Sequence, residues 1–328
     1  MKIFYLQPQL SSVTNNLVRV ARLVAVLFIA GFFPARLFGQ APIISYGTPP
    51  PNHLINTVIT PINPSNSGGA VALPMGVAGS PVLLGSGLTF SVNGAAVDTA
   101  GNIYVNDQDG TTGNVKKIAA DGSSTTIIGS GFLAQSANIA VDPAGNVYVA
   151  DQSNVWKIPA SGNPITYGTP IVINNTFPRP FGIAADAAGN VYVADLNAGV
   201  YKMSSNGSNK VKIDNGISSP SAVTVDPAGN VYTVSIADFK LYEIPANGSP
   251  QVVLASGFNF PRGLAVDAAG TIYVDDEGAN TIFKVPQGGG TPVAYVSSLS
   301  NAVGVAVDAG YNVIVTLQGA GGMTNYRL

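Results

Sequence analysis

The sequence predicts an all-β protein built from repeated four-stranded units, the architecture of a β-propeller. One observation is the number of turn-forming residues, 38 glycines and 23 prolines among 328 residues, which is more than a helical protein needs. The other is a motif of the form Asp-x-x-Gly-Asn, followed by a short Val/Ile/Tyr run. Variants of this motif recur six times along the chain, and such self-similarity indicates a repeat architecture.

The spacing of the repeat narrows the choice of unit. A fixed period in the low forties is typical of a four-stranded propeller blade or of a helix-pair repeat. Each unit contains short Val/Ile/Tyr runs bounded by Gly, Asn, Pro and Asp, with no 3.6-residue apolar periodicity, and therefore indicates strands. The shared aspartates follow one another at steps of 44, 44, 40, 41 and 41 residues: Asp98, Asp142, Asp186, Asp226, Asp267 and Asp308.

One unit shows the expected order of strands and turns. An aspartate in the first turn is expected to bond nearby backbone amides, and the glycine after it to supply a positive φ. A residue that recurs in every repeat is expected to have a role in folding that every repeat shares. We therefore interpret the repeated aspartates as structural. The strands of this unit are expected at residues 182–185, 191–195, 200–203 and 210–213.

These units resemble the NHL repeat family, whose members are six-bladed propellers with units that read G-[ILV]-A-V-D-x-x-G-N-[VI]-Y-V-x-D. The resemblance covers about residues 94 to 328. The last unit departs from the pattern, because Leu317 stands in place of the final Asp, and the chain ends where a third strand is expected.

A missing fourth strand would leave the last blade with a bare edge, so another segment should supply it. Residues 81–85 match the fourth strand of another unit and lie just before the first full unit. We therefore expect six four-stranded blades, the last closed by this N-terminal strand. A propeller of seven blades, one of them incomplete and using residues 70–74, is the alternative.

The N-terminal part predicts export. Residues 1–41 contain four basic residues and no acidic one, and residues 23–33 form an uncharged apolar run. That run is too short for a membrane span, which needs about 20 residues, but fits a signal peptide cleaved after Ala41. An uncleaved anchor is the alternative. Residues 42–69 are expected to form a Pro/Asn/Thr-rich leader or a remnant immunoglobulin-like segment, and residues 70–328 the propeller.

Composition excludes several classes of protein. The chain has no cysteine, which excludes disulfides and thiol chemistry. Its one histidine, His53, precedes the repeats, so a Ser-His-Asp triad or a histidine zinc site within the propeller is excluded. Residues 42–328 keep 11 of the 15 basic residues and all 17 acidic ones, a formal charge of −6. Nucleic acid is therefore not an expected partner. We expect a monomer that is secreted, periplasmic or held at the cell surface.

The resemblance implies that candidate site residues gather on one face, which second-to-third-strand loops and the crossovers between blades share. An acidic face would attract metal ions and basic peptides. Arg179 and Arg262, in the crossovers, are candidates for binding a carboxylate or a sugar acid. The acidic residues expected on this face are Asp107, Asp109, Asp151, Asp195, Asp238, Asp275, Asp276 and Glu277.

The expected function is that of an exported NHL-repeat scaffold, without catalytic residues, that binds a protein, peptide or glycan through its acidic face. The alternative is a divalent-metal-dependent, lactonase-like or esterase-like hydrolase of the six-bladed propeller type. No cofactor is expected other than Ca²⁺ or another divalent cation. Its candidate ligands are Asp275, Asp276 and Glu277, because carboxylate oxygens suit such ions.

Overall fold

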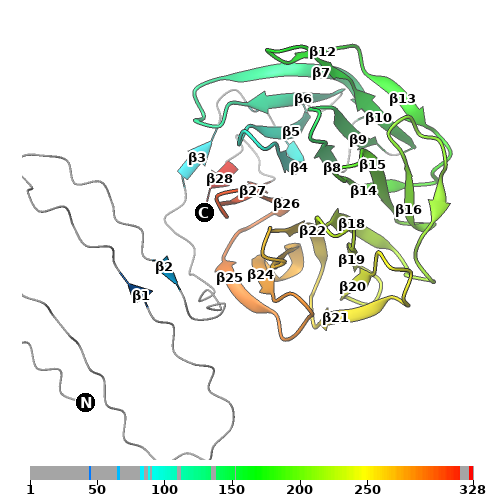
Figure 1. Ribbon diagram of the computed structural model, residues 1–328, viewed down its shortest axis with the longest axis vertical. Helices are drawn as coiled ribbons and strands as arrows, with labels where there is room; N and C mark the ends of the chain where they lie inside the picture. The colour runs from blue at the N-terminus through cyan, green and yellow to red at the C-terminus, as the bar shows by residue number, and fades with distance from the viewer. Residues whose placement is uncertain are drawn as a thin grey trace, which may run out of the picture. The chain divides into compact units, whose positions relative to one another are not determined.

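Figure 1 shows a computed structural model of the chain, which divides into two compact units, Met1–Ala72 and Leu73–Leu328. In the first unit, strands β1 (Ile44–Ser45) and β2 (Ser65–Asn66) pair antiparallel. The predicted signal peptide and the alternative strand at 70–74 lie outside the described residues. The structure describes residues 44–45, 65–66, 82–84, 88, 91–108, 112–133, 138–151, 153–317 and 325–327.

The second unit is an all-β propeller, as the sequence predicts. Five of its four-stranded antiparallel sheets take their strands in order from one stretch of chain. The first sheet contains β4 (Ser91–Val97), β5 (Ile103–Gln108), β6 (Thr112–Ile118) and β7 (Thr125–Leu133). The second contains β8 (Asn138–Val141), β9 (Val147–Asp151), β10 (Asn154–Ile158) and β13 (Ile171–Asn174). The third contains β14 (Pro180–Ala185), β15 (Asn190–Asp195), β16 (Gly199–Ser204) and β17 (Val211–Lys212).

The fourth and fifth sheets repeat this order. The fourth contains β18 (Pro220–Val225), β19 (Val231–Ser235), β20 (Lys240–Ile244) and β21 (Val252–Ser256). The fifth contains β22 (Pro261–Val266), β23 (Ile272–Asp276), β24 (Thr281–Val285) and β25 (Val293–Ser297). A short hairpin of β11 (Ala160–Ser161) and β12 (Thr166–Tyr167) is inserted in the second sheet between β10 and β13.

A further sheet joins the two ends of the propeller. It contains β26 (Ala302–Val307), β27 (Val313–Leu317), β28 (Asn325–Arg327) and β3 (Val82–Leu84). β3 pairs antiparallel with β28, so that Leu84 lies opposite Asn325 and Val82 opposite Arg327. Figure 1 shows the two strands side by side. The N-terminal strand thus covers the edge that the last unit would leave bare, in the sheet where the sequence predicts it. We call this the closing sheet.

The repeated aspartates fasten the turn between the first two strands of each sheet. Asp186 accepts hydrogen bonds from the backbone of Ala188 and Asn190, at 2.9 and 2.8 Å, and from the Asn190 amide and the Tyr192 hydroxyl, at 2.7 and 2.9 Å. Burial acts to raise the pKa of Asp186, but these hydrogen bonds outweigh it and lower the pKa. Bonds of the same kind recur at Asp98, Asp142 and Asp226. These aspartates are structural, as predicted.

Small residues let the innermost strands of neighbouring sheets approach closely. A Cβ added at Gly182 would lie 2.7 Å from the Ala222 Cα, which no real side chain tolerates. The innermost strands, β4, β8, β14, β18, β22 and β26, surround a channel with a cavity of about 150 Å³, lined largely by Ala, Val, Ile and Leu. The buried tyrosines Tyr104, Tyr148 and Tyr192 fill the space between sheets. Across the described residues, no helix is long and apolar enough to cross a membrane.

Candidate functional site at the channel mouth

The mouth is the end of the channel at which the innermost strands begin. In five of these strands the pairing register shifts by one residue near that end, which leaves one residue unpaired in a bulge. A bulge bends its strand and re-aims the side chain of the extra residue. Ser221 and Val303 are buried. The residue in the bulge differs from sheet to sheet: Gly94, Phe181, Ser221, Arg262 and Val303.

Arg262 is the charged member of this set, and it lies over a neighbouring bulge residue. Its guanidinium carbon is 5.2 Å from the centre of the Phe181 ring, within the range of a cation–π contact. Its Nη1 donates to Glu277 Oε2 at 2.9 Å. The two side chains stay 24% and 26% exposed. Solvent or a ligand can therefore reach both members of this ion pair.

Arg179 lies on the same side of the propeller, two residues before Phe181. Its side chain is exposed, and within the described ranges it forms no ion pair. Its backbone N–H donates to Asp195 Oδ2 at 2.9 Å, which fixes the backbone from which the side chain projects. Two arginines and one aromatic ring thus belong to the mouth.

Most of the described carboxylates that the sequence assigns to an acidic face are buried. Asp107, Asp151, Asp195, Asp275 and Asp276 are at most 1% exposed. Asp151, Asp195 and Asp276 accept hydrogen bonds from backbone N–H groups of the chain that leads into their own sheet. Asp107 instead pairs with Lys116 at 2.5 Å. A carboxylate held by backbone N–H groups is stabilised without facing solvent. Asp238, by contrast, is partly exposed beside Lys240, and Asp109 lies outside the described residues.

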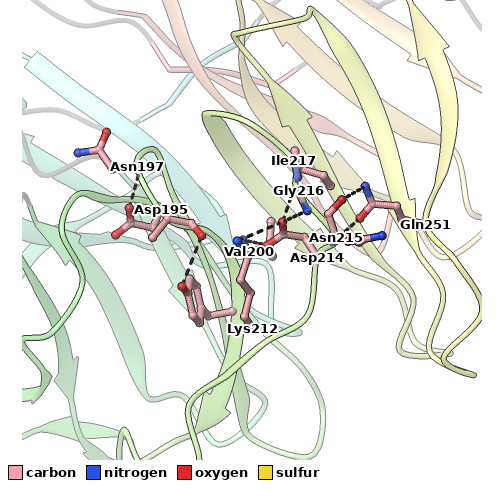
Figure 2. Close-up of polar contacts among 11 residues, drawn as sticks. Asp195, Asn197, Val200, Lys212, Asp214, Asn215, Gly216, Ile217 and Gln251 are labelled. Atoms are coloured by element: carbon pink, nitrogen blue, oxygen red, sulfur yellow. Dashed lines mark hydrogen bonds and ion pairs between the residues drawn. The ribbon is translucent and has the colours of Figure 1, made fainter.

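Asp195 shows how such a carboxylate is used. It accepts from the backbone N–H of Arg179 and, at 2.9 Å, from that of Asn197, as Figure 2 shows for the second contact. Asp151 does the same work in the second sheet, where it accepts from the Leu133 N–H at 3.0 Å and from the Trp156 indole at 2.8 Å. These aspartates therefore hold the second strand of a sheet against the crossover segment that precedes that sheet.

Asp214 has a related role at the outer edge of the third sheet. Figure 2 shows it accepting from the backbone N–H groups of Val200, Gly216 and Ile217, at 2.5, 3.0 and 3.0 Å. The next residue, Asn215, exchanges two hydrogen bonds with the Gln251 side chain of the fourth sheet. The crossover is therefore bonded to both sheets that it joins.

The three candidate metal ligands do not act together. Asp276 accepts from the backbone N–H groups of Asn259 and Phe260, both at 2.7 Å, and caps the short 3₁₀ helix η1 (Glu277–Ala279). Glu277 pairs with Arg262, and Asp275 is buried apart from both contacts. No group of three or more His, Cys, Asp or Glu side chains is placed to hold a metal ion in the part of the chain that the structure describes.

Asp275 is the most unusual of the predicted residues. It is fully buried, and neither of its carboxylate oxygens has a hydrogen-bond partner among the residues that the structure describes. Burial raises its pKa to about 8, the charges of Glu277 and Asp276 act in the same direction, and the Arg262 charge opposes them. The carboxyl group is therefore neutral at pH 7. It lies in the space left by Gly263, where a Cβ would be 3.2 Å from Asp275 Oδ2 and 3.2 Å from the Val305 nitrogen.

Sequence reasoning missed one polar residue of this kind, Asn106. It is fully buried, and within the described ranges its amide nitrogen and oxygen have no hydrogen-bond partner. The signal was available in the repeat, because the position just before the final Asp of the motif is apolar in the second, third and fourth sheets and polar in the other three. Its occupants, in chain order, are Asn106, Ala150, Ala194, Val234, Asp275 and Thr316.

Comparisons with known proteins identify the fold but no family. No protein-family model matches the chain, and no curated protein matches it. A crystal structure of a nidogen/laminin complex is similar, with 20% identity, 60% of this chain and 76% of that chain covered, and a TM-score of 0.53. A streptogramin B lyase is similar, with 11% identity, coverage of 75% and 96%, and a TM-score of 0.54. The PQQ-bound aldose sugar dehydrogenase of Streptomyces coelicolor has 15% identity, coverage of 75% and 95%, and a TM-score of 0.58.

Identities this low show the fold alone. The similar propellers include both binding proteins and enzymes, and a shared fold does not choose between them. The function has to be argued from the mouth itself.

Proposed function

We propose that this chain is an exported, NHL-type six-bladed propeller that binds an acidic group of a protein, peptide or glycan at the channel mouth, without catalysis. The observation that carries the proposal is the accessible Arg262 over the Phe181 ring, with the exposed Arg179 two residues before that ring in the chain. The five sequential sheets and the closing sheet support the count of six blades. The apolar run at residues 23–33 supports export.

The chemistry of the mouth favours an anionic ligand group. A guanidinium presents a planar set of donors that matches a carboxylate, and it keeps its charge at every accessible pH. Glu277 already occupies Arg262 in this way, so a ligand carboxylate would replace the Glu277 side chain with the same type of contact. Phe181 offers an apolar face for the rest of the ligand. The neutral carboxyl of Asp275 does not repel an anion at pH 7.

The proposal keeps the role that the sequence predicts for Arg179 and Arg262 as carboxylate-binding residues. It does not use the predicted attraction of cations, because five of the aspartates of the predicted acidic face are buried. What remains accessible near the bulge residues is one free arginine and one arginine–glutamate pair. Charge complementarity of this kind selects acidic partners.

The test compares an acidic ligand with its uncharged methyl ester. Trigalacturonic acid and its methyl ester are titrated by calorimetry, together with a hexaglutamate peptide, into wild-type protein and into Arg262→Ala, Arg179→Ala and Lys212→Ala variants. Lys212 is the matched control, because it pairs with Asp214 on an outer strand. We expect the acid or the peptide to bind, the ester to bind at least tenfold more weakly, and Arg262→Ala to cost about tenfold, since a charged hydrogen bond contributes about 1.5–3 kcal/mol. Equal effects of all three variants would contradict the proposal.

The metal-dependent hydrolase requires oxygen ligands that converge on one ion. Asp276 and Glu277 are already engaged by backbone N–H groups and by Arg262, and no other observation favours this alternative. Hydrolysis of a lactone panel that is abolished by EDTA would establish it in place of the binding function.

A further inference from the structure

A groove on the outer part of the propeller breaks the repeat. It lies between the first sheet and the hairpin β11–β12 of the second sheet, and its cavity measures about 550 Å³. Figure 1 shows β12 beside β7. In the third sheet the corresponding place holds only a tight turn, in which the Gly207 N–H bonds the Ser204 carbonyl. The insertion therefore creates a feature that the fold itself does not need.

The hairpin is fixed against the first sheet rather than free to close over the groove. The Tyr167 hydroxyl lies 2.8 Å from that of Tyr104, and their rings meet edge to face with centroids 6.5 Å apart. Ile165 contacts the turn of the second sheet, where a Cβ added at Gly145 would be 3.1 Å from the Ile165 Cδ1. The wall of the groove is thus formed before any ligand arrives, which lowers the entropic cost of binding.

One end of the groove carries a cation. Lys117 Nζ lies 5.7 Å from the centroids of both the Tyr104 and the Tyr167 rings. It forms no ion pair with another described residue, and no Asp or Glu lines the groove. The nearest carboxylate along this network, Asp98, already accepts from Asn102 and from the Tyr104 hydroxyl. The lysine is therefore available to an external anion.

The rest of the groove contains exposed isoleucines. Ile127 is 61% exposed and Ile165 is 42% exposed, and Ile128 lines the same cavity. Covering such side chains stabilises a complex by about 25 cal/mol for each Å² removed from water. Small polar groups, from Asn102, Thr126 and Thr166, lie around them.

We propose that this groove binds a small organic anion with an apolar body, whose acidic group contacts Lys117 and whose body covers Ile127 and Ile165. The cavity has the size typical of small-molecule sites, about 300–1,000 Å³. Charge complementarity specifies the acidic group, and the exposed isoleucines specify the body. The site is separate from the channel mouth, so this proposal does not depend on the function proposed there.

The test uses two fluorescent probes that differ in one charged group. 1-Anilinonaphthalene-8-sulfonate carries a sulfonate, and N-phenyl-1-naphthylamine has the same rings without it. Each is titrated into folded wild-type protein and into Lys117→Gln. The control is Lys284→Gln, because Lys284 occupies the equivalent position of the fifth sheet, where Tyr273 and Tyr295 lie near its ammonium group.

We expect the sulfonate to bind at least fivefold more tightly than the neutral probe. Lys117→Gln should weaken the sulfonate about five- to tenfold without changing the neutral probe, and Lys284→Gln should change neither. A second variant, Ile127→Ser, should weaken both probes, whereas Val253→Ser, at a 51% exposed valine of β21, should not.

Three results would overturn the proposal. They are equal affinity for the two probes, equal effects of the two lysine variants, and no saturable binding by the wild type. Circular dichroism of each variant verifies that the fold is intact. If Lys117→Gln fails to fold, the pair Ile127→Ser and Val253→Ser decides, since both positions are on the surface.

Discussion

The two ends of the channel are built from the same strands, yet they differ in how strictly the repeat is kept. At the turn end, Asp186, Asn190 and Tyr192 form a hydrogen-bond set whose counterparts recur from sheet to sheet. At the mouth end, the bulge residues are a glycine, a phenylalanine, a serine, an arginine and a valine. The residues at the turn end are those that every sheet needs in order to fold. The residues at the mouth end differ from sheet to sheet, so they are not set by the needs of folding.

Some residues that break the repeat at the mouth end destabilise the fold, whereas the repeated residues at the turn end stabilise it. Asp275 is buried with no hydrogen-bond partner in the described part of the chain, and alanines, Ala150 and Ala194, occupy the same position in the second and third sheets. Burying a carboxyl group without a partner destabilises a fold, or keeps the group protonated. Selection for stability alone would favour alanine there. The comparison therefore predicts that substitutions at the turn end lower stability, and that some substitutions at the mouth raise it.

The largest effect is expected at the turn end. Asp186→Ala removes four hydrogen bonds to one carboxylate and should lower the free energy of unfolding by about 3 kcal/mol. For a domain of this size that corresponds to a fall in Tm of about 6–12 °C. Asp121→Ala is the control, because Asp121 is exposed and its carboxylate bonds the nearby Ser123 backbone. A fall no larger than that of the control would show that the repeated aspartates are dispensable.

The opposite sign is expected for Asp275→Asn. The pKa of Asp275 rises from 3.8 to about 8 on folding, so its contribution to stability is fully present below pH 3.8 and is lost as the pH rises through 8. A pKa difference of one unit corresponds to about 1.4 kcal/mol, so the wild type should lose about 2–3 kcal/mol relative to the variant between pH 5 and pH 7. Denaturant unfolding at both pH values measures this.

The control for that experiment is Asp121→Asn. The pKa of Asp121 is lowered by hydrogen bonds from Ser123, so its titration lies below pH 5, and the variant should keep the wild-type pH dependence from pH 5 to 7. An identical pH dependence in wild type and Asp275→Asn would mean that Asp275 is ionised at neutral pH, and would remove the contrast between the two ends.

A smaller gain in stability is expected from a substitution in the fourth sheet, at a position where other sheets have lysine. Glu243 lies opposite Tyr232, whereas Lys157 and Lys202 lie over Tyr148 and Tyr192, at 5.6 and 5.2 Å. Burial and the Asp226 charge raise the pKa of Glu243. Glu243→Lys should stabilise the protein by about 0.5–1 kcal/mol, because it replaces a repulsion with a cation–π contact. Thermal unfolding would reveal a loss of stability if the glutamate has a partner that favours it.

No change is expected on adding or removing a divalent cation. An ion at 100 times its Kd would stabilise the fold by about 2.7 kcal/mol, a shift of several degrees. Because Asp276 and Glu277 already have partners, Tm should be the same with EDTA and with excess Ca²⁺. A clear rise with Ca²⁺ would favour the metal-dependent alternative and would identify the mouth as an ion site.

The strands, the structural aspartates and the closing strand β3 could be predicted, because each depends on a pattern that repeats along the chain. The burial of Asp195 and Asp276 could not. Each binds backbone N–H groups 16 or 17 residues earlier in the sequence, and only the folded crossover brings those groups within reach. The pairing of Arg262 with Glu277 and its contact with Phe181 depend on the same tertiary arrangement.

The hairpin β11–β12 was missed for a different reason. Its residues lie in the second repeat, which is 44 residues long, the same length as the first repeat. The spacing of the repeats alone therefore does not indicate an insertion. The extra residues of the first repeat belong to a nine-residue strand, β7, whereas those of the second repeat form the hairpin. Only the position of the fourth strand within each repeat distinguishes a longer strand from an inserted hairpin.

The affinity of the protein for trigalacturonic acid and for its methyl ester, with Arg262 and with alanine in its place, tests the central claim most directly. The account predicts that the wild type prefers the acid at least tenfold and that Arg262→Ala abolishes the preference while its Tm stays near the wild-type value. A preference for the acid that survives in Arg262→Ala would contradict the claim that the mouth binds an acidic group through this arginine.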